Sequence, residues 1–268
     1  MKYILSKSKL EDLYLNQKLS DGQIGQMYDV SLGVIHRLRS KYNIKAIEYY
    51  QRHPKQELDL KEKEFLIGVL LGDGHLRWRN KIDKRAYPQL MLEQSIIHKE
   101  YIFWLKDQIN DWIFDQNKPI KQNRKNKSNK VYHSYSFQTV CHPVFIEFHN
   151  AFYSNNKKII DIEFIKKYFS LYSLAIWLMD DGTISKNRNI VICSHSFSKE
   201  ENEILQGFIF EKFNLKTNIW INDNNNNPLY YLAFPKEDSI KLTNLVKEYF
   251  IPSFTYKLIS PETTKETY

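Results

Sequence analysis

Two apolar runs of helical length dominate the hydrophobic pattern of the chain. They extend over residues 65–74 and 173–182, and each ends in an aspartate followed by glycine, at Asp73 and at Asp181. A helix that is apolar on all sides must be buried, and its C-terminal end carries unpaired carbonyl oxygens and partial negative charge. Because the two aspartates add full negative charges there, the pattern predicts two adjacent buried helices whose ends hold one or two hard cations such as Mg²⁺.

The pattern that follows each apolar run repeats as well. Each is followed by basic residues, an apolar strand and an amphipathic helix, then by a further strand and helix, and each copy closes on a lysine, at Lys158 or Lys257. Two ordinary core helices with glycine caps are the alternative, but they do not account for an internal repeat. The sequence therefore predicts an α+β fold with two pseudo-symmetric αββαββα lobes, residues 59–157 and 158–259.

The first 45 residues have the helical pattern of a small helix-turn-helix module. Leu10, Leu13 and Tyr14 share one face of a first helix, and Ser20 and Ser31 are placed to begin a second and a third helix. In such a motif the third helix enters the major groove. The candidate DNA contacts on it are Gly33, His36, Arg37 and Ser40. A three-helix module that contacts protein is the alternative.

Polar and basic stretches separate these elements. Residues 46–58 are predicted to be a linker, and residues 260–268 a disordered tail. On sheets that lie along a duplex, basic loops supply phosphate contacts, although a solvated loop is the plainer interpretation. The predicted DNA-binding residues in and beside these loops are Arg77, Arg79, Lys81, Arg85, Lys121, Arg124, Lys125, Lys127, Lys130, Lys186 and Arg188.

Composition narrows the function classes. The net charge of +8 and the pI near 9.1 favour a polyanionic partner, although a bias towards lysine codons would produce the same charge. Two cysteines are too few for a disulfide framework or a zinc cluster. Neither a signal peptide nor a membrane-spanning helix is recognisable, so an intracellular protein is expected.

Two nine-residue motifs carry a family resemblance. Leu66–Gly74 and Leu174–Gly182, together with Asn155–Lys158 and the segment Ile251–Leu258, resemble the LAGLIDADG homing endonucleases in their single-chain, two-motif form. The second half is most similar to the yeast mitochondrial omega-intron endonuclease branch. The resemblance covers roughly residues 60–259. Ile176 departs from it, because the family often has glycine at that position.

The resemblance implies a fold and a chemistry. Two lobes would pack through the motif helices, and their sheets would form a saddle over DNA. Mg²⁺, with Mn²⁺ able to substitute, would be held by Asp73 and Asp181 and by the carbonyl oxygens of the residues before them, Gly72 and Asp180. The implied reaction is hydrolysis of both DNA strands to leave 3′ overhangs.

Other residues receive roles from the same resemblance. Lys158 and Lys257 would stabilise the phosphorane or help to activate water. Gln94 and His195 are expected at equivalent strand positions, where they would hold waters of the metal site. A surface lysine and an ordinary strand histidine are the plainer alternatives for Lys158, Lys257 and His195.

The expected partner is double-stranded DNA with a long asymmetric target site, bound by a monomer. An RNA maturase that binds intron RNA is one alternative, and a non-catalytic helix-turn-helix transcription regulator is another. The resemblance places such a protein in the mitochondrial matrix or another organelle, or in a bacterial or phage cytoplasm.

Overall fold

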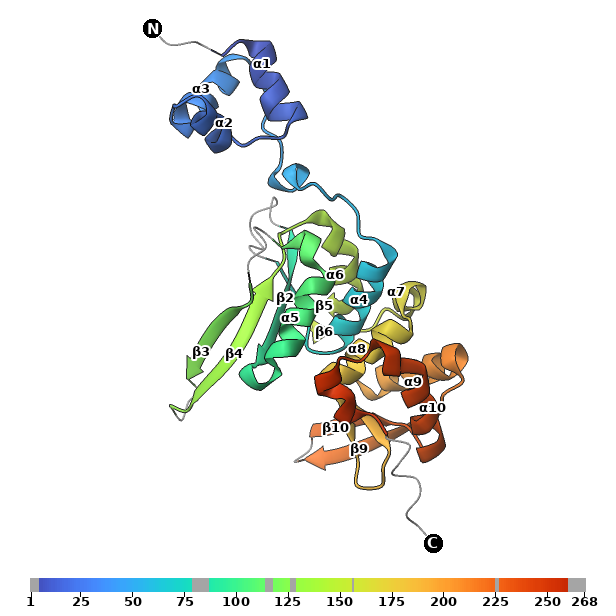
Figure 1. Cartoon of the computed structure of the whole chain (residues 1–268). Coiled ribbons are helices and arrows are strands. Elements are labelled where there is room, and N and C mark those ends of the chain that lie inside the picture. The colour runs from blue at the N-terminus through green and yellow to red at the C-terminus, as the bar shows by residue number, and fades with distance from the viewer. Residues whose placement is uncertain are drawn as a thin grey trace. The chain divides into compact units, whose positions relative to one another are not determined.

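The chain divides between residues 56 and 57 into two units, each with its own core (Figure 1). The computed structural model describes residues 5–78, 87–113, 118–125, 129–155, 157–224 and 227–259. Of the predicted sites, Arg79, Lys81, Arg85 and Lys127 lie outside these residues, as does the predicted tail. Within the described ranges, no helix is long and apolar enough to cross a membrane.

Three helical segments form the first unit where the sequence predicts them. They are α1 (Lys7–Glu11), continued by a π-helical turn (Asp12–Asn16), then α2 (Asp21–Met27) and α3 (Leu32–Lys41). Ser20 and Gln23 form a capping box at the start of α2. Gly25 allows the close approach of the turn, because a Cβ atom there would lie 2.6 Å from the Val30 carbonyl oxygen. Leu10, Leu13, Ile24 and Ile35 are fully buried between the segments.

Residues 46–56, predicted to be a linker, group with this first unit. A short 3₁₀ helix (Tyr49–Arg52) folds back on the module. The Arg52 guanidinium donates to the Lys18 carbonyl oxygen at 2.7 Å and lies 4.6 Å from the Tyr14 ring centroid. Polar composition suggested a linker, but an arginine can bury its stem on an aromatic ring while it keeps its charge hydrated.

The second unit begins with one αββαββα lobe. Its elements are α4 (Leu60–Leu71), β1 (His75–Trp78), β2 (Pro88–Ser95), α5 (Lys99–Gln108), β3 (Ile120–Lys125), β4 (Val131–Gln138) and α6 (Ile146–Phe152), with 3₁₀ turns at Ile96–His98, Asn110–Trp112 and Pro143–Phe145. The strands pair antiparallel in the order β1-β2-β4-β3. Two short strands, β5 (Tyr153–Ser154) and β6 (Lys157–Lys158), then pair antiparallel as a hairpin that leads into α7 (Ile162–Tyr168). The predicted lobe boundary before Lys158 therefore falls inside a hairpin of the first lobe.

The second lobe repeats this order. Its elements are α8 (Leu171–Asp181), β7 (Gly182–Ile184), β8 (Ile190–Cys193), α9 (Lys199–Phe213), β9 (Asn218–Asn224), β10 (Asn227–Ala233) and α10 (Lys236–Val246), followed by 3₁₀ turns at Lys247–Tyr249 (η7) and Pro252–Lys257 (η8). Its sheet order, β7-β8-β10-β9, matches that of the first lobe. The predicted α+β fold with two αββαββα lobes is confirmed.

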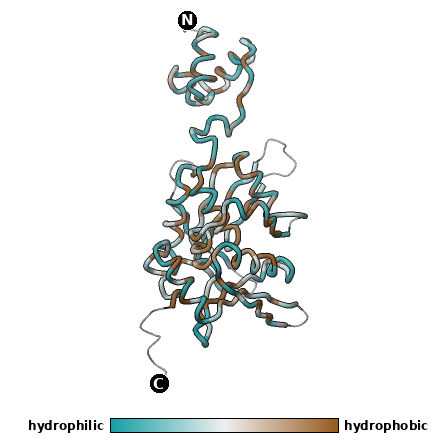
Figure 2. Tube along the Cα trace, turned by 90° about the vertical axis from the view of Figure 1, so that its right-hand side faces the viewer, coloured by the Kyte–Doolittle hydropathy of each residue, from teal (hydrophilic) through white to brown (hydrophobic). Residues whose placement is uncertain are grey.

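The two lobes meet where α4 packs against α8. Residues 65–71 and 173–179 of these helices are fully buried, and Figure 2 shows hydrophobic segments gathered inside the larger unit. A Cβ atom on Gly68 would lie 2.8 Å from the Cβ of Ile176, so Gly68 provides the space that Ile176 occupies. The Ser173 hydroxyl donates to the Glu64 carbonyl oxygen at 2.7 Å. Gly68 thus allows a close crossing at this point despite the isoleucine.

Candidate functional site

The C-terminal ends of α4 and α8 bring three carboxylates together. Asp73 follows α4 directly after its C-cap, Gly72, and Asp180 and Asp181 are the last two residues of α8. Gly74 closes the turn after Asp73, where its N–H donates to the Val69 carbonyl oxygen at 2.6 Å and a Cβ atom would lie 2.5 Å from that oxygen. The apolar helices thus position the acidic groups at the lobe junction.

Asp73 is exposed, and its orientation is set by neighbours. The Gln94 amide, on β2, donates to Asp73 Oδ2 at 2.8 Å. The backbone N–H of Asp73 donates to Asp180 Oδ2 at 3.2 Å, which links the two motifs directly. The other oxygen of Asp73 makes no hydrogen bond within the described structure.

The Asp180 carboxylate is half-buried and crosses from the second lobe into the first. Tyr101, on α5, donates its hydroxyl to Asp180 Oδ1 at 2.8 Å. Burial raises the pKa of Asp180 well above its ordinary value, and the charges of Asp73 and Asp181 add to that effect. The sequence interpretation used only the carbonyl oxygen of this residue. The sequence does carry a signal for a role of this side chain, because Asp180 stands in the second motif at the position where the first motif has a glycine, Gly72.

Asp181 occupies the second helix end in a different environment. Its Oδ2 accepts a hydrogen bond from the indole N–H of Trp177 at 3.3 Å. Burial raises the pKa of Asp181 to about 7, with the charge of Asp73 acting in the same direction, while Lys158, Trp177 and Lys257 oppose the shift. The site therefore holds more negative charge than its surroundings stabilise.

Each predicted lysine reaches the helix end of its own lobe. Lys158 Nζ donates to the Gly72 carbonyl oxygen at 2.8 Å. Lys257 Nζ donates to the carbonyl oxygens of Met179 and, at 3.1 Å, Asp180. Burial lowers the pKa of both lysines, and the nearby carboxylates oppose that shift. The two ammonium groups thus lie against the carbonyl oxygens predicted to face a metal.

The expected equivalence of Gln94 and His195 is off by one residue. His75 pairs with Met91 in the first sheet and Thr183 pairs with Val191 in the second, so the position that matches Gln94 is Ser194. Ser194 is buried, and its hydroxyl donates to the Asn202 side chain on α9. His195 lies beyond the end of β8, exposed, with its ring edge-on to Tyr231 at 4.3 Å. A shift of one residue turns a side chain to the other face.

The outer face of the first sheet is hollow beside Asp73. The hollow has a volume of about 850 Å³ and is lined by polar side chains that include His75, Glu93, Gln122, Arg124 and Gln138. Arg124 pairs with Glu93 at 2.6 Å. Lys121 alternates with Gln122 and Arg124 along β3, so it belongs to the opposite face. Arg77 and Lys130 are exposed on β1 and just before β4.

The second sheet presents a different outer face. A smaller hollow of about 280 Å³ is lined by Thr183, Val191, Trp220, Asn222 and Tyr231, among others. Lys186 is exposed in the β7–β8 turn, and Arg188 is half-buried there with a φ of 60°. The first sheet is therefore polar and charged where the second is aromatic and amide-bearing.

The helix-turn-helix candidates lie along α3. His36, Arg37 and Ser40 are exposed, and Gly33 is half-buried. Arg39, between them, is buried instead, with its guanidinium paired to both carboxylate oxygens of Asp21 at 2.7 and 2.8 Å. This internal ion pair was not predicted, because the local pattern gives no sign that Arg39 pairs with Asp21, which lies 18 residues before it.

The side chains of Asp73, Asp180 and Asp181 do not by themselves form a group suited to hold a metal ion, and the described residues contain no other such group of three or more His, Cys, Asp and Glu side chains. A metal at the helix ends would need backbone carbonyl oxygens and water in addition to carboxylates, which is the ligand set that Mg²⁺ accepts. The surplus of carboxylate charge, shown by the raised pKa values of Asp180 and Asp181, fits a divalent cation.

Comparisons with known proteins agree on one family. Residues 63–242 match the profile of the LAGLIDADG DNA endonuclease family. The chain is 32% identical over 223 residues to a probable intron-encoded endonuclease 1 of Wickerhamomyces canadensis, across 81% of this chain and 91% of that protein. It is 29% identical over 203 residues to cytochrome b mRNA maturase bI2 of Debaryomyces hansenii, across 75% of this chain and 74% of that protein.

One solved structure is similar over most of its length. It is the homing endonuclease I-WcaI bound to its DNA recognition sequence, with 32% sequence identity and a TM-score of 0.68. The match covers 79% of this chain and 90% of that chain.

Proposed function

Because the chain belongs to the LAGLIDADG DNA endonuclease family, we propose that it is a site-specific homing endonuclease that hydrolyses both strands of a DNA duplex. The observation that carries the proposal is the pair of matched helix ends. Each combines a motif aspartate, Asp73 or Asp181, with a lysine from the end of the same lobe, Lys158 or Lys257. A regulator that only binds DNA has no use for this doubled set.

Divalent metal is assigned to the helix ends. Asp73 and Asp181, with the carbonyl oxygens of Gly72 and Asp180, would hold Mg²⁺, for which Mn²⁺ could substitute. When bound, such an ion supplies an activated water and offsets charge on the leaving oxygen. The two lysines, which hydrogen-bond these carbonyl oxygens in the structure, would then be close enough to stabilise charge on the phosphate.

Several side chains hold the acids in place. Gln94 donates to Asp73 and Trp177 donates to Asp181, so each acid is oriented by its own lobe. His195 would hold a water molecule of the metal site in the second lobe and would not contact a carboxylate itself. Cleavage at two offset phosphates would leave 3′ overhangs.

The two sheets would bind the duplex as a saddle. Their outer faces differ, with Glu93 and Arg124 on one and Trp220 and Tyr231 on the other. Different faces recognise different half-sites, so we assign a long asymmetric target. A single chain contains both lobes, and a monomer therefore suffices.

Intron RNA maturation is the second candidate function. It is favoured by the similarity to cytochrome b mRNA maturase bI2. Endonuclease residues and RNA binding can coexist on one chain, so retention of both aspartates does not decide between them. A transcription regulator is the least supported alternative.

The test begins by selecting bound duplexes from a randomised pool in Ca²⁺. Cleavage of the selected duplex is then measured in Mg²⁺ for the wild type, Asp73→Asn and Asp181→Asn, with Glu203→Gln on the α9 surface as the matched control. The wild type and the control should cut both strands, and each asparagine variant should bind in Ca²⁺ but make no double-strand break. An asparagine variant that cuts at the wild-type rate would remove that aspartate from the site.

A further inference from the structure

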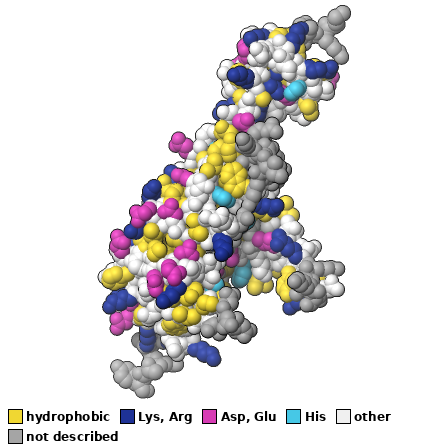
Figure 3. Space-filling view, turned by 180° about the vertical axis from the view of Figure 1, so that it is seen from behind, with side chains coloured by type: hydrophobic (Ala, Val, Ile, Leu, Met, Phe, Trp, Pro, Cys, Tyr) yellow, Lys and Arg dark blue, Asp and Glu magenta, His cyan; other side chains and the backbone are white. Residues whose placement is uncertain are grey.

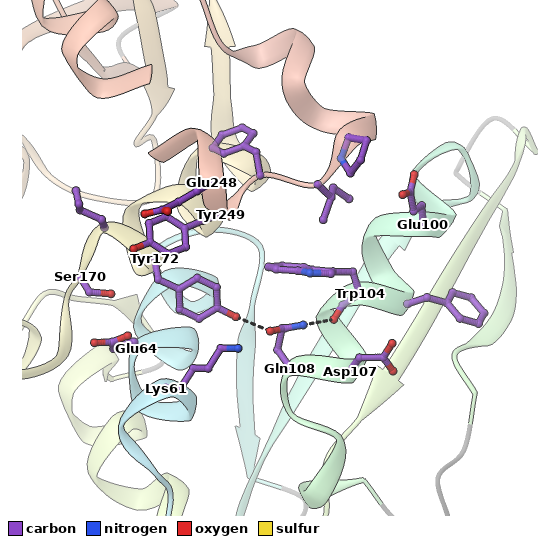
Figure 4. Close-up of a pocket in the computed structure, with 15 residues that line it drawn as sticks. Lys61, Glu64, Glu100, Trp104, Asp107, Gln108, Ser170, Tyr172, Glu248 and Tyr249 are labelled. Carbon is purple, nitrogen blue, oxygen red and sulfur yellow. Dashed lines mark hydrogen bonds between the residues drawn. The ribbon is translucent and has the colours of Figure 1, made fainter. Parts of the chain in front are cut away.

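Another hollow of the second unit lies at the other end of the motif helices. It has a volume of about 1070 Å³ and is bordered by the first residues of α4 and α8, by α5, and by the η7–η8 segment (Figure 4). None of the three carboxylates at the helix ends lines it. Lys61, which does, precedes Asp73 by twelve residues, and a helix advances about 18 Å over that length.

The aromatic wall of this pocket consists of Trp104, Tyr172 and Tyr249, and hydrogen bonds help to hold it in place. Figure 4 shows the Trp104 ring projecting from α5, with Tyr172 and Tyr249 on the facing side. The Tyr172 hydroxyl donates to Gln108 Oε1 at 2.9 Å, and the Gln108 amide donates to the Trp104 carbonyl oxygen at 3.2 Å. The Tyr172 ring lies 6.3 Å from Trp104 and 5.8 Å from Tyr249, centroid to centroid. The rings are thus positioned before any ligand arrives.

The charge of the pocket is opposite to that of the chain. Four carboxylates line it, on α4, on α5 and before Tyr249, against one lysine, Lys61: they are Glu64, Glu100, Asp107 and Glu248. Counting four negative charges and one positive charge, the lining carries a formal charge of −3, whereas the whole chain carries +8. Such a site repels phosphate backbones and attracts cations.

The chain already places one cation on this aromatic wall. The Lys61 ammonium lies 5.7 Å from the Tyr172 ring centroid, within the range of a cation–π interaction. Lys61 thereby shows which chemistry the wall accepts, and it also occupies part of the space.

We propose that this pocket binds a basic, partly apolar segment of a partner protein, with an arginine or lysine seated against Trp104 and Tyr172. The carboxylates lie on several separate elements. This arrangement suits a segment with several positively charged side chains better than a single small cation. The pocket is also lined by Phe250, Ile251 and Pro252, which would contact the apolar residues of the bound segment. The site is distinct from the proposed cleavage site, so partner and DNA can be bound together.

The test uses full-length protein and a short synthetic peptide that alternates arginine with leucine, titrated by calorimetry. The control peptide replaces every arginine with citrulline, which keeps the shape and removes the charge. The arginine peptide should bind in a salt-sensitive manner and roughly tenfold tighter than the citrulline peptide, given the size of cation–π and ion-pair interactions. Equal binding of the two peptides would overturn the proposal.

Variants locate the peptide on the surface. The double variant Glu64→Gln with Glu248→Gln, and separately Trp104→Ala, should each weaken binding roughly tenfold, whereas Lys61→Gln should strengthen it by freeing the Tyr172 face. Thermal melting checks that each variant is folded, and the carboxylate pair keeps the test valid if Trp104→Ala is not. Unchanged affinity in the folded carboxylate double variant would contradict the assignment.

Competition separates the classes of partner. The selected DNA duplex, and separately a single-stranded RNA, are added to the peptide complex. Neither should displace the peptide from the acidic pocket, and displacement by RNA would instead make the pocket part of a nucleic-acid surface. Because peptide binding needs no cleavage activity, its failure can be told apart from a failure of the proposed endonuclease function.

Discussion

The carboxylate of Asp180 fills the space that Gly72 leaves open. A Cβ atom on Gly72 would lie 2.4 Å from Asp180 Oδ2 and 2.6 Å from Asp180 Cβ, closer than such atoms approach in proteins. The same carboxylate accepts hydrogen bonds from the Asp73 N–H and from Tyr101. The two motifs therefore fit together through a glycine on one side and an acid on the other.

The first prediction is that Gly72→Ala destabilises the protein, because the added methyl group collides with Asp180. Overpacking in a closed core typically costs ~1–3 kcal/mol, which denaturant unfolding measures directly. Gly207→Ala on α9 is the matched control, since no atom lies within 4 Å of its Cβ position. That control should gain about 0.5–1 kcal/mol from helix propensity. Equal stability of the two variants would show that the helix ends can separate freely.

The second prediction concerns pH in the absence of metal. The pKa of Asp181 in the folded protein is about 7, above its ordinary value of 3.8, because the carboxyl is buried and lies near Asp73. A raised carboxyl pKa contributes stability that is full below about pH 4 and is lost as pH rises through 7. The melting temperature of wild type relative to Asp181→Asn should therefore fall between pH 4 and pH 7.

Calorimetry in EDTA at several pH values measures this difference. Glu203→Gln is the control, and its melting temperature should change with pH as that of the wild type does. Ca²⁺ should restore the wild type at pH 7 more than it restores Asp181→Asn, because an ion that binds the folded state stabilises it. A difference between wild type and Asp181→Asn that does not change with pH would mean that Asp181 titrates normally.

The third prediction concerns salt. If basic side chains of the first sheet neutralise phosphates, affinity should drop by ~10³–10⁵ between about 50 and 200 mM salt for roughly six to ten contacts. Replacing Arg124, Lys125 and Lys127 with alanine should lower the slope of log affinity against log salt by roughly one per lost contact. Lys166→Ala on α7, whose side chain pairs with Glu163 and Glu211, is the control. An unchanged slope in the triple variant would place those three residues away from DNA.

The fourth prediction separates the helix-turn-helix unit from the two lobes. A protein that begins at residue 57 should fold and cut DNA, because both motifs and both lysines lie beyond that point. The full chain should protect extra base pairs on one flank and bind more tightly, commonly by ~10²–10⁴ for a tethered second contact. Footprinting and titration of both proteins measure this, and identical footprints would assign residues 1–56 another role.

Two neighbouring arginines distinguish contact from folding in that unit. Arg37→Ala should lose the flanking protection without a change in thermal stability, since Arg37 is exposed. Arg39→Ala should unfold the unit, because removing one partner of a buried ion pair costs about 3–5 kcal/mol and leaves Asp21 uncompensated.

Local pattern was sufficient to predict the elements of the fold. Continuous apolar runs identified α4 and α8, and the repeat after each run predicted the lobe order. The repeat also showed that each copy closes on a lysine, whereas a role for Lys158 and Lys257 beside the helix ends came from the family resemblance; the two lysines hydrogen-bond the carbonyl oxygens of Gly72 and Asp180. These features depend on periodicity and order along the chain, which a sequence displays directly.

What could not be predicted depends on tertiary fit. The position of His195 was misjudged because strand register is decided by pairing, and β8 ends at Cys193. The crossing of the Asp180 side chain into the first lobe depends on how close two helices come, which Gly68 and Gly72 determine together. The contact of Arg52 with the Tyr14 ring joins residues that are far apart in the sequence, and Arg52 lies in a polar stretch whose pattern gives no sign of it.

The fit of Asp180 against Gly72 also determines which halves can pair. Two copies of the second lobe, joined through α8, would bring Asp180 against Asp180, where like charges and crowded side chains oppose association. Two copies of the first lobe would face each other with Gly72 on both sides, and the contacts that Asp180 makes would be lost. A gene that encoded either half alone would therefore not yield a stable homodimer, whereas separately expressed first and second halves would recognise each other.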